Sequence, residues 1–175
     1  MKDKRSDLSR LVIALVVAMS LFGCATSPKP LSGLPEGVPL PKDIHVVSPP
    51  ADLPKEIAAF SGKWTGKWDG IIDSVLIVEE INDKEARIIV ASESYSGPMM
   101  IGAPEAIQGG YMRVLARVGT NPKPNIEFEI KKLDQPVVTF EMQKDLKTIK
   151  GFWTYISDLW EDHVLVVRMI LKRAQ

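Results

Sequence analysis

The chain is poor in the side chains that most often carry catalysis and metal binding. It has one cysteine, Cys24, so neither an intrachain disulfide nor a multi-cysteine metal site can form. It has two histidines, His45 and His163, which weighs against histidine-dependent catalysis. Its 22 basic and 22 acidic residues balance, so no positive excess favours nucleic acid. We expect no catalytic residues, no metal, no cofactor and no nucleic-acid partner.

Long hydrophobic runs are also missing, apart from a short one near the start. Residues 1–10 carry four basic side chains, and residues 11–22 are almost wholly apolar. As a helix, this apolar run would span roughly 18 Å, less than the bilayer core of about 30 Å. A basic start followed by a short apolar run is typical of a signal peptide. We assign residues 1–23 to it.

The residues that follow indicate the kind of signal. Leu21-Phe22-Gly23-Cys24 resembles the lipobox of bacterial lipoproteins. This resemblance implies cleavage before Cys24, lipid (including palmitate) on that cysteine, and attachment to the cell envelope. No aspartate follows the cysteine, which in a cell with two membranes implies the outer one. The alternative is an uncleaved anchor with an incidental cysteine.

Residues 24–54 predict a tether. Eight of the 13 prolines lie between residues 28 and 54, which disfavours helix and central strand. A semi-rigid spacer is the first interpretation and a proline-rich ligand for a partner domain the second. Its second half is apolar enough to pack on a domain. Residues 52–60 predict a short helix, with Asp52 as its cap and Pro54 in its first turn.

Residues 55–175 predict an all-β domain. Alternation of apolar and polar residues marks eight candidate strands, at 62–69, 73–81, 85–92, 111–118, 125–131, 137–142, 148–155 and 163–172. Short strands without a strong amphipathic helix favour an antiparallel barrel or sandwich. We expect a closed up-and-down barrel, because closure removes the exposed strand edges.

The two ends of this domain carry a resemblance. A short helix leading into Gly62-Lys63-Trp64, with a basic residue on the last strand, resembles the calycin pattern of lipocalins, fatty-acid-binding proteins and avidins. This resemblance implies a first-strand tryptophan packed beneath an arginine of the closing strand. Trp64 and Arg168 are the matching positions, with Trp68 and Arg173 as alternates.

The closing strand alternates without becoming polar on either face. Its even positions include Val166 and Ile170, and its odd positions include Val167 and Met169. A solvated outer face should be polar. We therefore expect a cover, either segment 39–59 or a second chain, which includes a homo-oligomer or an envelope protein partner.

Aromatic and flexible apolar residues are the candidate ligand-binding groups. Those on the expected strands are Trp64, Trp68, Trp153 and Tyr155. They either line a pocket for an apolar, aromatic or glycan ligand or simply fill a small barrel. The loop 94–110 contains Met99 and Met100 between glycines, so it is either a lid or an irregular strand with a turn.

Acidic residues offer a weaker candidate site. Asp158, Glu161 and Asp162 are either a cation or carboxylate site or, the interpretation we favour, an exposed acidic turn. Three functions remain. The first is an envelope lipoprotein whose barrel binds a small apolar or aromatic ligand or a glycan. The second is a non-catalytic interaction or structural lipoprotein with a filled barrel, and the third is a carboxylate-dependent hydrolase.

Overall fold

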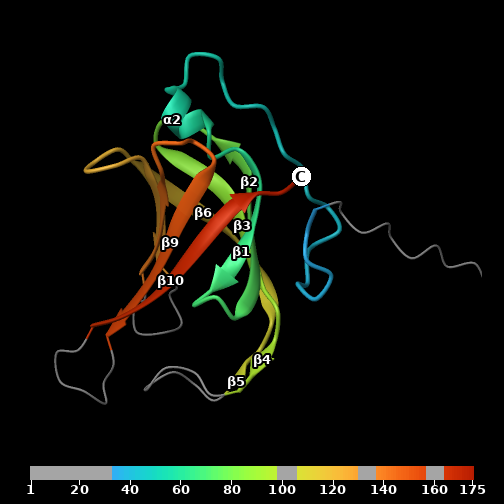
Figure 1. Ribbon diagram of the computed structural model, residues 1–175. Coiled ribbons are helices and arrows are strands. Elements are labelled where there is room, and N and C mark those ends of the chain that lie inside the picture. Colours follow the sequence, from blue (N-terminus) through green and yellow to red (C-terminus); the bar gives the residue numbers. More distant parts are fainter. Residues whose placement is uncertain (1–32, 98–105, 130–136, 157–163) are drawn as a thin grey trace, which may run out of the picture. The chain divides into compact units, whose positions relative to one another are not determined.

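The computed structural model describes residues 33–97, 106–129, 137–156 and 164–175. Eight antiparallel strands form a closed barrel in the order β1-β10-β9-β8-β7-β6-β3-β2 (Figure 1). Neighbours in the ring are neighbours along the chain, apart from the insertion of β4 and β5, so the barrel is up-and-down. The expected fold class is confirmed. A compact unit spans Ser32–Gln175.

The elements lie close to the expected ranges. They are α2 (Lys55–Ala58), β1 (Gly62–Trp68), β2 (Ile72–Ile81), β3 (Glu85–Ser92), β4 (Tyr95–Ser96), β5 (Ala106–Ile107), β6 (Gly110–Gly119), β7 (Asn125–Glu129), β8 (Val137–Met142), β9 (Thr148–Ile156) and β10 (Val164–Arg173). β4 and β5 pair as a separate two-stranded sheet within the loop 94–110. Met99 and Met100 lie outside the described residues, so the prediction of a lid stays open.

The first hairpin shows why β1 and β2 pair tightly. Asp69 and Gly70 both have positive φ, 46° and 75°, and the Ile71 amide donates to the Trp68 carbonyl over 2.9 Å. Two consecutive positive φ angles give a turn whose twist matches that of antiparallel strands, and Asp-Gly is a preferred sequence for it. Ile71 completes the three-residue connection, because Trp68 pairs with Ile72. The turn fixes Trp64 opposite Leu76.

The barrel interior is apolar because alternate residues point inward. From β1 to β3 the buried inward side chains are Trp64, Trp68, Ile72, Leu76, Val78, Ile81, Ala86 and Ile88. From β6 to β10 they are Ala116, Ile126, Phe128, Val138, Phe140, Met142, Ile149, Val167, Met169 and Leu171. Ile57 and Phe60 extend this core toward α2. Burial of these side chains is the main driving force for the fold.

The segment before α2 covers part of the barrel's outside. Val38, with Leu34, Leu40 and Ile44 at its sides, packs on the outward residues of β2 and β3, which are Val75, Ile77, Ile89 and Ala91. The second half of the predicted tether therefore packs on the domain. We call residues 33–47 the covering segment.

The closing strand is not covered in the way the sequence suggested. Val166 and Ile170, on the outer face of β10, are 36% and 58% exposed. The expectation that segment 39–59 covers this face was wrong, because the apolar outer faces of β2 and β3 take the covering segment instead.

An ion-pair network holds the covering segment in place. The Arg113 guanidinium on β6 lies 3.1 Å from Asp43 of the segment and 2.9 Å from the carboxylate of Glu79 on β2. Glu79 is only 4% exposed, and it also accepts the His45 amide over 3.2 Å. The hydrogen bond from Arg113 lowers the pKa of the Asp43 carboxyl below its ordinary value. Arg113 thus links two strands to the segment.

Replacing Arg113 by methionine should lower the melting temperature by about 5–10 °C, because the buried Glu79 carboxylate would lose its counter-charge. Asp43→Asn should change it by less than about 2 °C, because Asp43 is exposed. Thermal unfolding of residues 25–175, which retain the compact unit, measures both changes. Equal shifts for the two variants would contradict this division of roles.

Acid should weaken the same contact. Because the pKa of Asp43 is lowered in the folded state, its stabilising contribution is fully present above the unfolded pKa of about 4 and is lost as the pH falls through the folded value. Asp43→Asn should therefore remove part of the acid sensitivity below about pH 4.

Candidate functional site

The end of the barrel next to α2 is closed by a stacked pair. The Arg173 guanidinium lies 4.4 Å from the centre of the Trp64 ring. It donates to the carbonyls of Ser61 and Ala59 over 2.8 and 2.7 Å, while the Trp64 indole N–H donates to the Phe60 carbonyl over 2.8 Å. Burial lowers the pKa of the Arg173 guanidinium. Trp64 and Phe60 are both fully buried here.

This geometry decides between the arginines proposed from the sequence. Trp64 pairs with Arg173 across β1 and β10, so Arg173, one of the alternates, occupies the position expected of Arg168. Arg168 is exposed on the outer face and pairs with Phe152 of β9. Trp64 is thus fully buried in the core beneath Arg173, and its role as a ligand contact stays a prediction.

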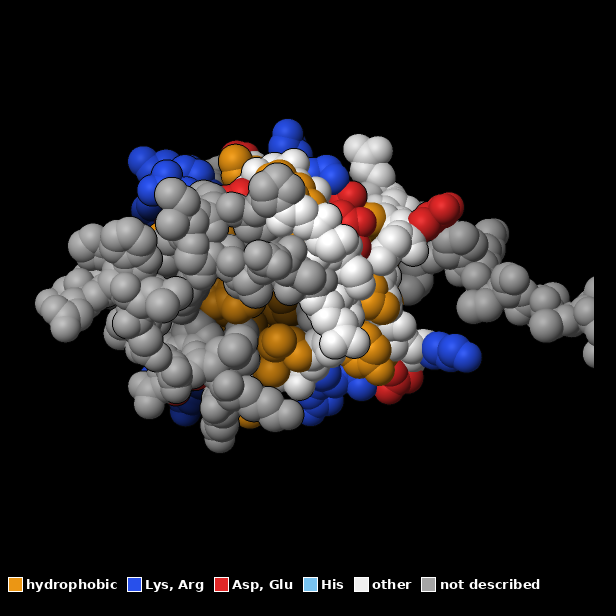
Figure 2. Space-filling view, turned by 90° about the horizontal axis from the view of Figure 1, so that it is seen from below, with side chains coloured by type: hydrophobic (Ala, Val, Ile, Leu, Met, Phe, Trp, Pro, Cys, Tyr) orange, Lys and Arg blue, Asp and Glu red, His pale blue; other side chains and the backbone are white. Residues whose placement is uncertain are grey.

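The opposite end, which we call the distal end, contains a cavity of about 220 Å³. Its lining residues lie on every strand of the barrel except β2 and β10, apart from Gln108, which lies outside the barrel strands. They are Trp68, Val90, Ala91, Ser92, Gln108, Gly110, Tyr111, Met112, Phe128, Val138 and Trp153. Figure 2 views this end and shows hydrophobic side chains lining a hollow. We call this hollow the distal cavity.

Two of the predicted residues meet in the distal cavity. Trp68 on β1 and Trp153 on β9 contact edge to face, with ring centres 6.1 Å apart and planes at 64°. Edge-to-face contact is a favoured arrangement of two aromatic rings, and it presents both ring edges and ring faces. Both indoles point inward, because the even-numbered residues of β1 and the odd-numbered residues of β9 face the barrel interior.

Trp153, one of the lining residues, has an unusual indole nitrogen. It is buried and has no hydrogen-bond partner among the described residues. Buried polar atoms are nearly always paired, and an unpaired donor costs about 1–3 kcal/mol. A ligand atom that accepts this hydrogen bond would remove the penalty.

Several lining residues escaped the sequence analysis. Phe128, Val138, Met112 and Tyr111 lie within strands that the sequence predicted, but it did not single them out as candidate ligand contacts. Alternation reveals which side chains point inward, but not where along the barrel the interior stops being filled. The backbone of Tyr155 lies on β9, its side chain is outside the described set, and Met99 and Met100 lie outside it altogether.

The described residues do not place an acidic candidate at this cavity. No aspartate, glutamate or histidine is among its described lining residues. Asp73 is bound to Lys67 on the outer face, and Asp158, Glu161, Asp162 and His163 lie outside the described residues. Within the described part of the chain, no cluster of three such residues could hold a metal ion.

In the described part of the chain no helix combines the length and apolar character that crossing a membrane requires. Comparison with known proteins gives no family: no family model, no curated protein and no solved structure matches the chain.

Proposed function

We propose that this protein is a lipid-anchored envelope protein with a lipocalin-like barrel, which binds a small apolar or aromatic ligand in the distal cavity. The observation that carries the proposal is the pairing of Trp68 and Trp153 around an apolar hollow with one unpaired donor. The Trp64–Arg173 stack supports the calycin resemblance.

The size of the cavity limits the ligand. A dry apolar cavity of about 150 Å³ is known to hold benzene. The distal cavity, at about 220 Å³, therefore suits one or two fused rings or a short branched chain. Its lining offers few polar groups for the hydroxyls of a sugar, so we favour the apolar ligand over the glycan.

The Trp153 donor sets a second requirement. A ligand with one carbonyl or ether oxygen at the edge of its rings would accept the indole N–H and still bury its apolar surface. The expected ligand is thus an aromatic or alicyclic ketone, quinone or ether rather than a pure hydrocarbon.

The proposed anchor places the barrel near the bilayer. Lipid on Cys24 is supported by the lipobox resemblance, and the packed covering segment starts at residue 33. The eight residues between them reach at most about 3.6 Å each, or roughly 30 Å in total. A ligand that partitions into membranes would be close at hand.

A matched ligand pair tests the proposal. Binding of 2-acetylnaphthalene should quench the tryptophan emission of the fragment of residues 25–175. The fragment should bind 2-ethylnaphthalene about threefold to tenfold more weakly, because only the ketone accepts the Trp153 hydrogen bond. Trp153→Phe should keep the cavity apolar and remove the difference between the two ligands. Isothermal titration measures the affinities of the variant.

A pair of controls on one strand locates the binding site. Met112→Trp should fill the mouth of the cavity and weaken binding of both ligands more than tenfold, whereas Leu115→Trp, on the outer face of β6, should not. No binding of either ligand would favour the filled-barrel interaction protein. Equal effects of both tryptophan substitutions would contradict the distal cavity as the site.

A further inference from the structure

An exposed isoleucine on the outer face of β10 is surrounded by four positive charges. Ile170 is 58% exposed and lies directly across from Lys67 of β1 on one side and Lys150 of β9 on the other. Arg168 and Lys172 flank it along its own strand, on the same face. Cross-strand neighbours are about 5 Å apart and same-face neighbours about 7 Å. We call these five residues the basic patch.

Three cations of this patch lack, among the described residues, the kind of ion pair that the arginines of β3 and β6 form. Arg117 of β6 and Arg87 of β3 form ion pairs with glutamates on adjacent strands, and Arg113 of β6 pairs with Glu79 of β2, on the far side of β3. In the patch, Lys67 pairs with Asp73, but Lys150, Arg168 and Lys172 have no ion pair with a described residue. Like charges at these separations repel one another. The patch is therefore suited to a negatively charged partner.

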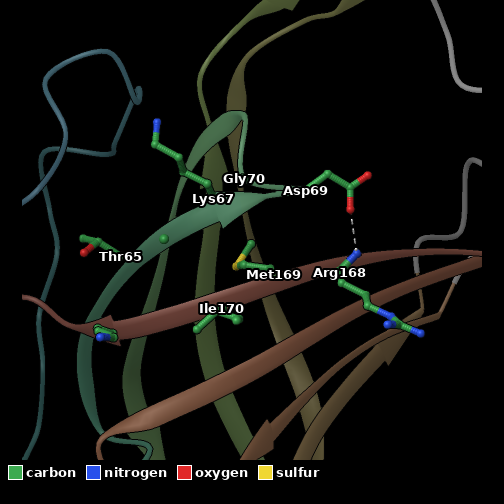
Figure 3. Close-up of a pocket in the computed structure, with 9 residues that line it drawn as sticks. Thr65, Lys67, Asp69, Gly70, Arg168, Met169 and Ile170 are labelled. Atoms are coloured by element: carbon green, nitrogen blue, oxygen red, sulfur yellow. Dashed lines mark hydrogen bonds between the residues drawn. The ribbon is translucent and has the colours of Figure 1, made fainter. Parts of the chain in front are cut away.

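The patch borders a groove along the seam between β1 and β10. The groove has a volume of about 580 Å³ and includes Thr65 and Gly70 among its lining residues. Figure 3 shows Lys67 on β1 and Arg168 on β10 extending away from each other, and Ile170 on β10. One carboxylate, that of Asp69, also lies at the groove, where it accepts the Arg168 amide over 3.3 Å. Glu141 of β8 lies across from Lys150 and is paired with Lys123. With Asp69, Asp73 and Glu141 counted, four positive charges of the patch face three negative ones, one of which already has another partner.

We infer that the basic patch docks on the surface of a bilayer containing anionic phospholipids. Phosphates would neutralise the cations, and Ile170, helped by the 36% exposed Val166, would enter the boundary between headgroups and acyl chains. Lysine is depleted at protein–protein interfaces, yet three of these four cations are lysines. Long flexible side chains suit a fluid layer of phosphates, which favours a membrane over an acidic protein.

Vesicle sedimentation with residues 25–175 tests this docking without the lipid anchor. The fragment should bind vesicles made of phosphatidylcholine and phosphatidylglycerol in equal parts, should release at high salt, and should bind phosphatidylcholine alone much more weakly. Lys150→Gln with Lys172→Gln should lower the partition coefficient about 30-fold, since each basic side chain near an anionic bilayer contributes about fivefold. Ile170→Asn should lower it about tenfold.

Arg87 and Leu115 provide the matched control. They are cross-strand partners on β3 and β6, one cationic and one 62% exposed and apolar, outside the basic patch. Arg87→Gln and Leu115→Asn should leave vesicle binding unchanged, and all variants should keep the melting temperature within a few degrees. Four results would overturn the inference. The first two are no binding of the fragment to vesicles, and equal binding to vesicles without anionic lipid. The other two are vesicle binding that the control variants reduce as much as the patch variants do, and binding that is confined to an acidic polypeptide such as polyglutamate. Ligand titration of the same variants reports separately on the distal cavity.

Discussion

Gly66→Ala should strongly destabilise the closed barrel. A Cβ atom at this position would collide with the Ile170 carbonyl oxygen and lie 2.9 Å from its carbonyl carbon and 3.1 Å from the Leu171 Cα. All three are backbone atoms of β10, which cannot move aside without separating from β1. Overpacking costs typically 1–3 kcal/mol, and here we expect about 3 kcal/mol or more.

Urea unfolding of residues 25–175, followed by tryptophan emission, measures the loss. Gly110→Ala is the matched control, because a Cβ atom on this strand glycine of β6 would meet nothing within 4 Å. It should leave the unfolding midpoint nearly unchanged. A Gly66→Ala protein as stable as the control would show that β1 and β10 do not approach each other as described.

Trp64→Ala should lower the free energy of unfolding by about 3–5 kcal/mol, the usual cost of truncating a large buried aromatic side chain. Trp64 is fully buried, donates to the Phe60 carbonyl and supports the Arg173 guanidinium on its ring face. Arg173→Met should cost less, about 1–2 kcal/mol, because it removes the cation–π contact and two hydrogen bonds but leaves the ring in place.

Arg168→Met is the control that separates the two arginines of the closing strand. Arg168 is exposed on the outer face, so its replacement should change stability by no more than about 0.5 kcal/mol. Combining Trp64→Ala with Arg173→Met should change the free energy of unfolding by an amount that differs from the sum of the two single changes. Combining Trp64→Ala with Arg168→Met should give the sum. The reverse pattern would contradict the observed register.

The arginine assignment shows where sequence reasoning ended. Arg168 and Arg173 lie on opposite faces of β10, and both faces are apolar, so alternation alone could not say which face is inside. The register of Trp64 against Arg173 decides it. The same ambiguity explains the misplaced cover. The continuous apolar run Val75–Val78 in β2 is as typical of a strand buried on both faces as the sequence of β10 is. The pattern therefore could not say which of the two strands the covering segment hides.

The candidate site was foreseen only in part. Two indoles on inward positions, Trp68 and Trp153, were predictable from period-two alternation, but their contact was not. It depends on β1 and β9 both lying beside β10, which places residues 85 positions apart in one small volume. The unpaired indole N–H of Trp153 is likewise a property of its surroundings.

The sequence alone determined the class of fold, because alternating apolar residues in short segments have no stable arrangement other than sheets with one buried face. It also determined which residues of β1 point inward, since Gly62, Trp64 and Trp68 share one parity. Only the tertiary structure decided which face of β10 is the interior, which strands the covering segment hides, and where the core leaves a hollow. Those outcomes depend on register and on packing between distant segments, and a local pattern contains neither.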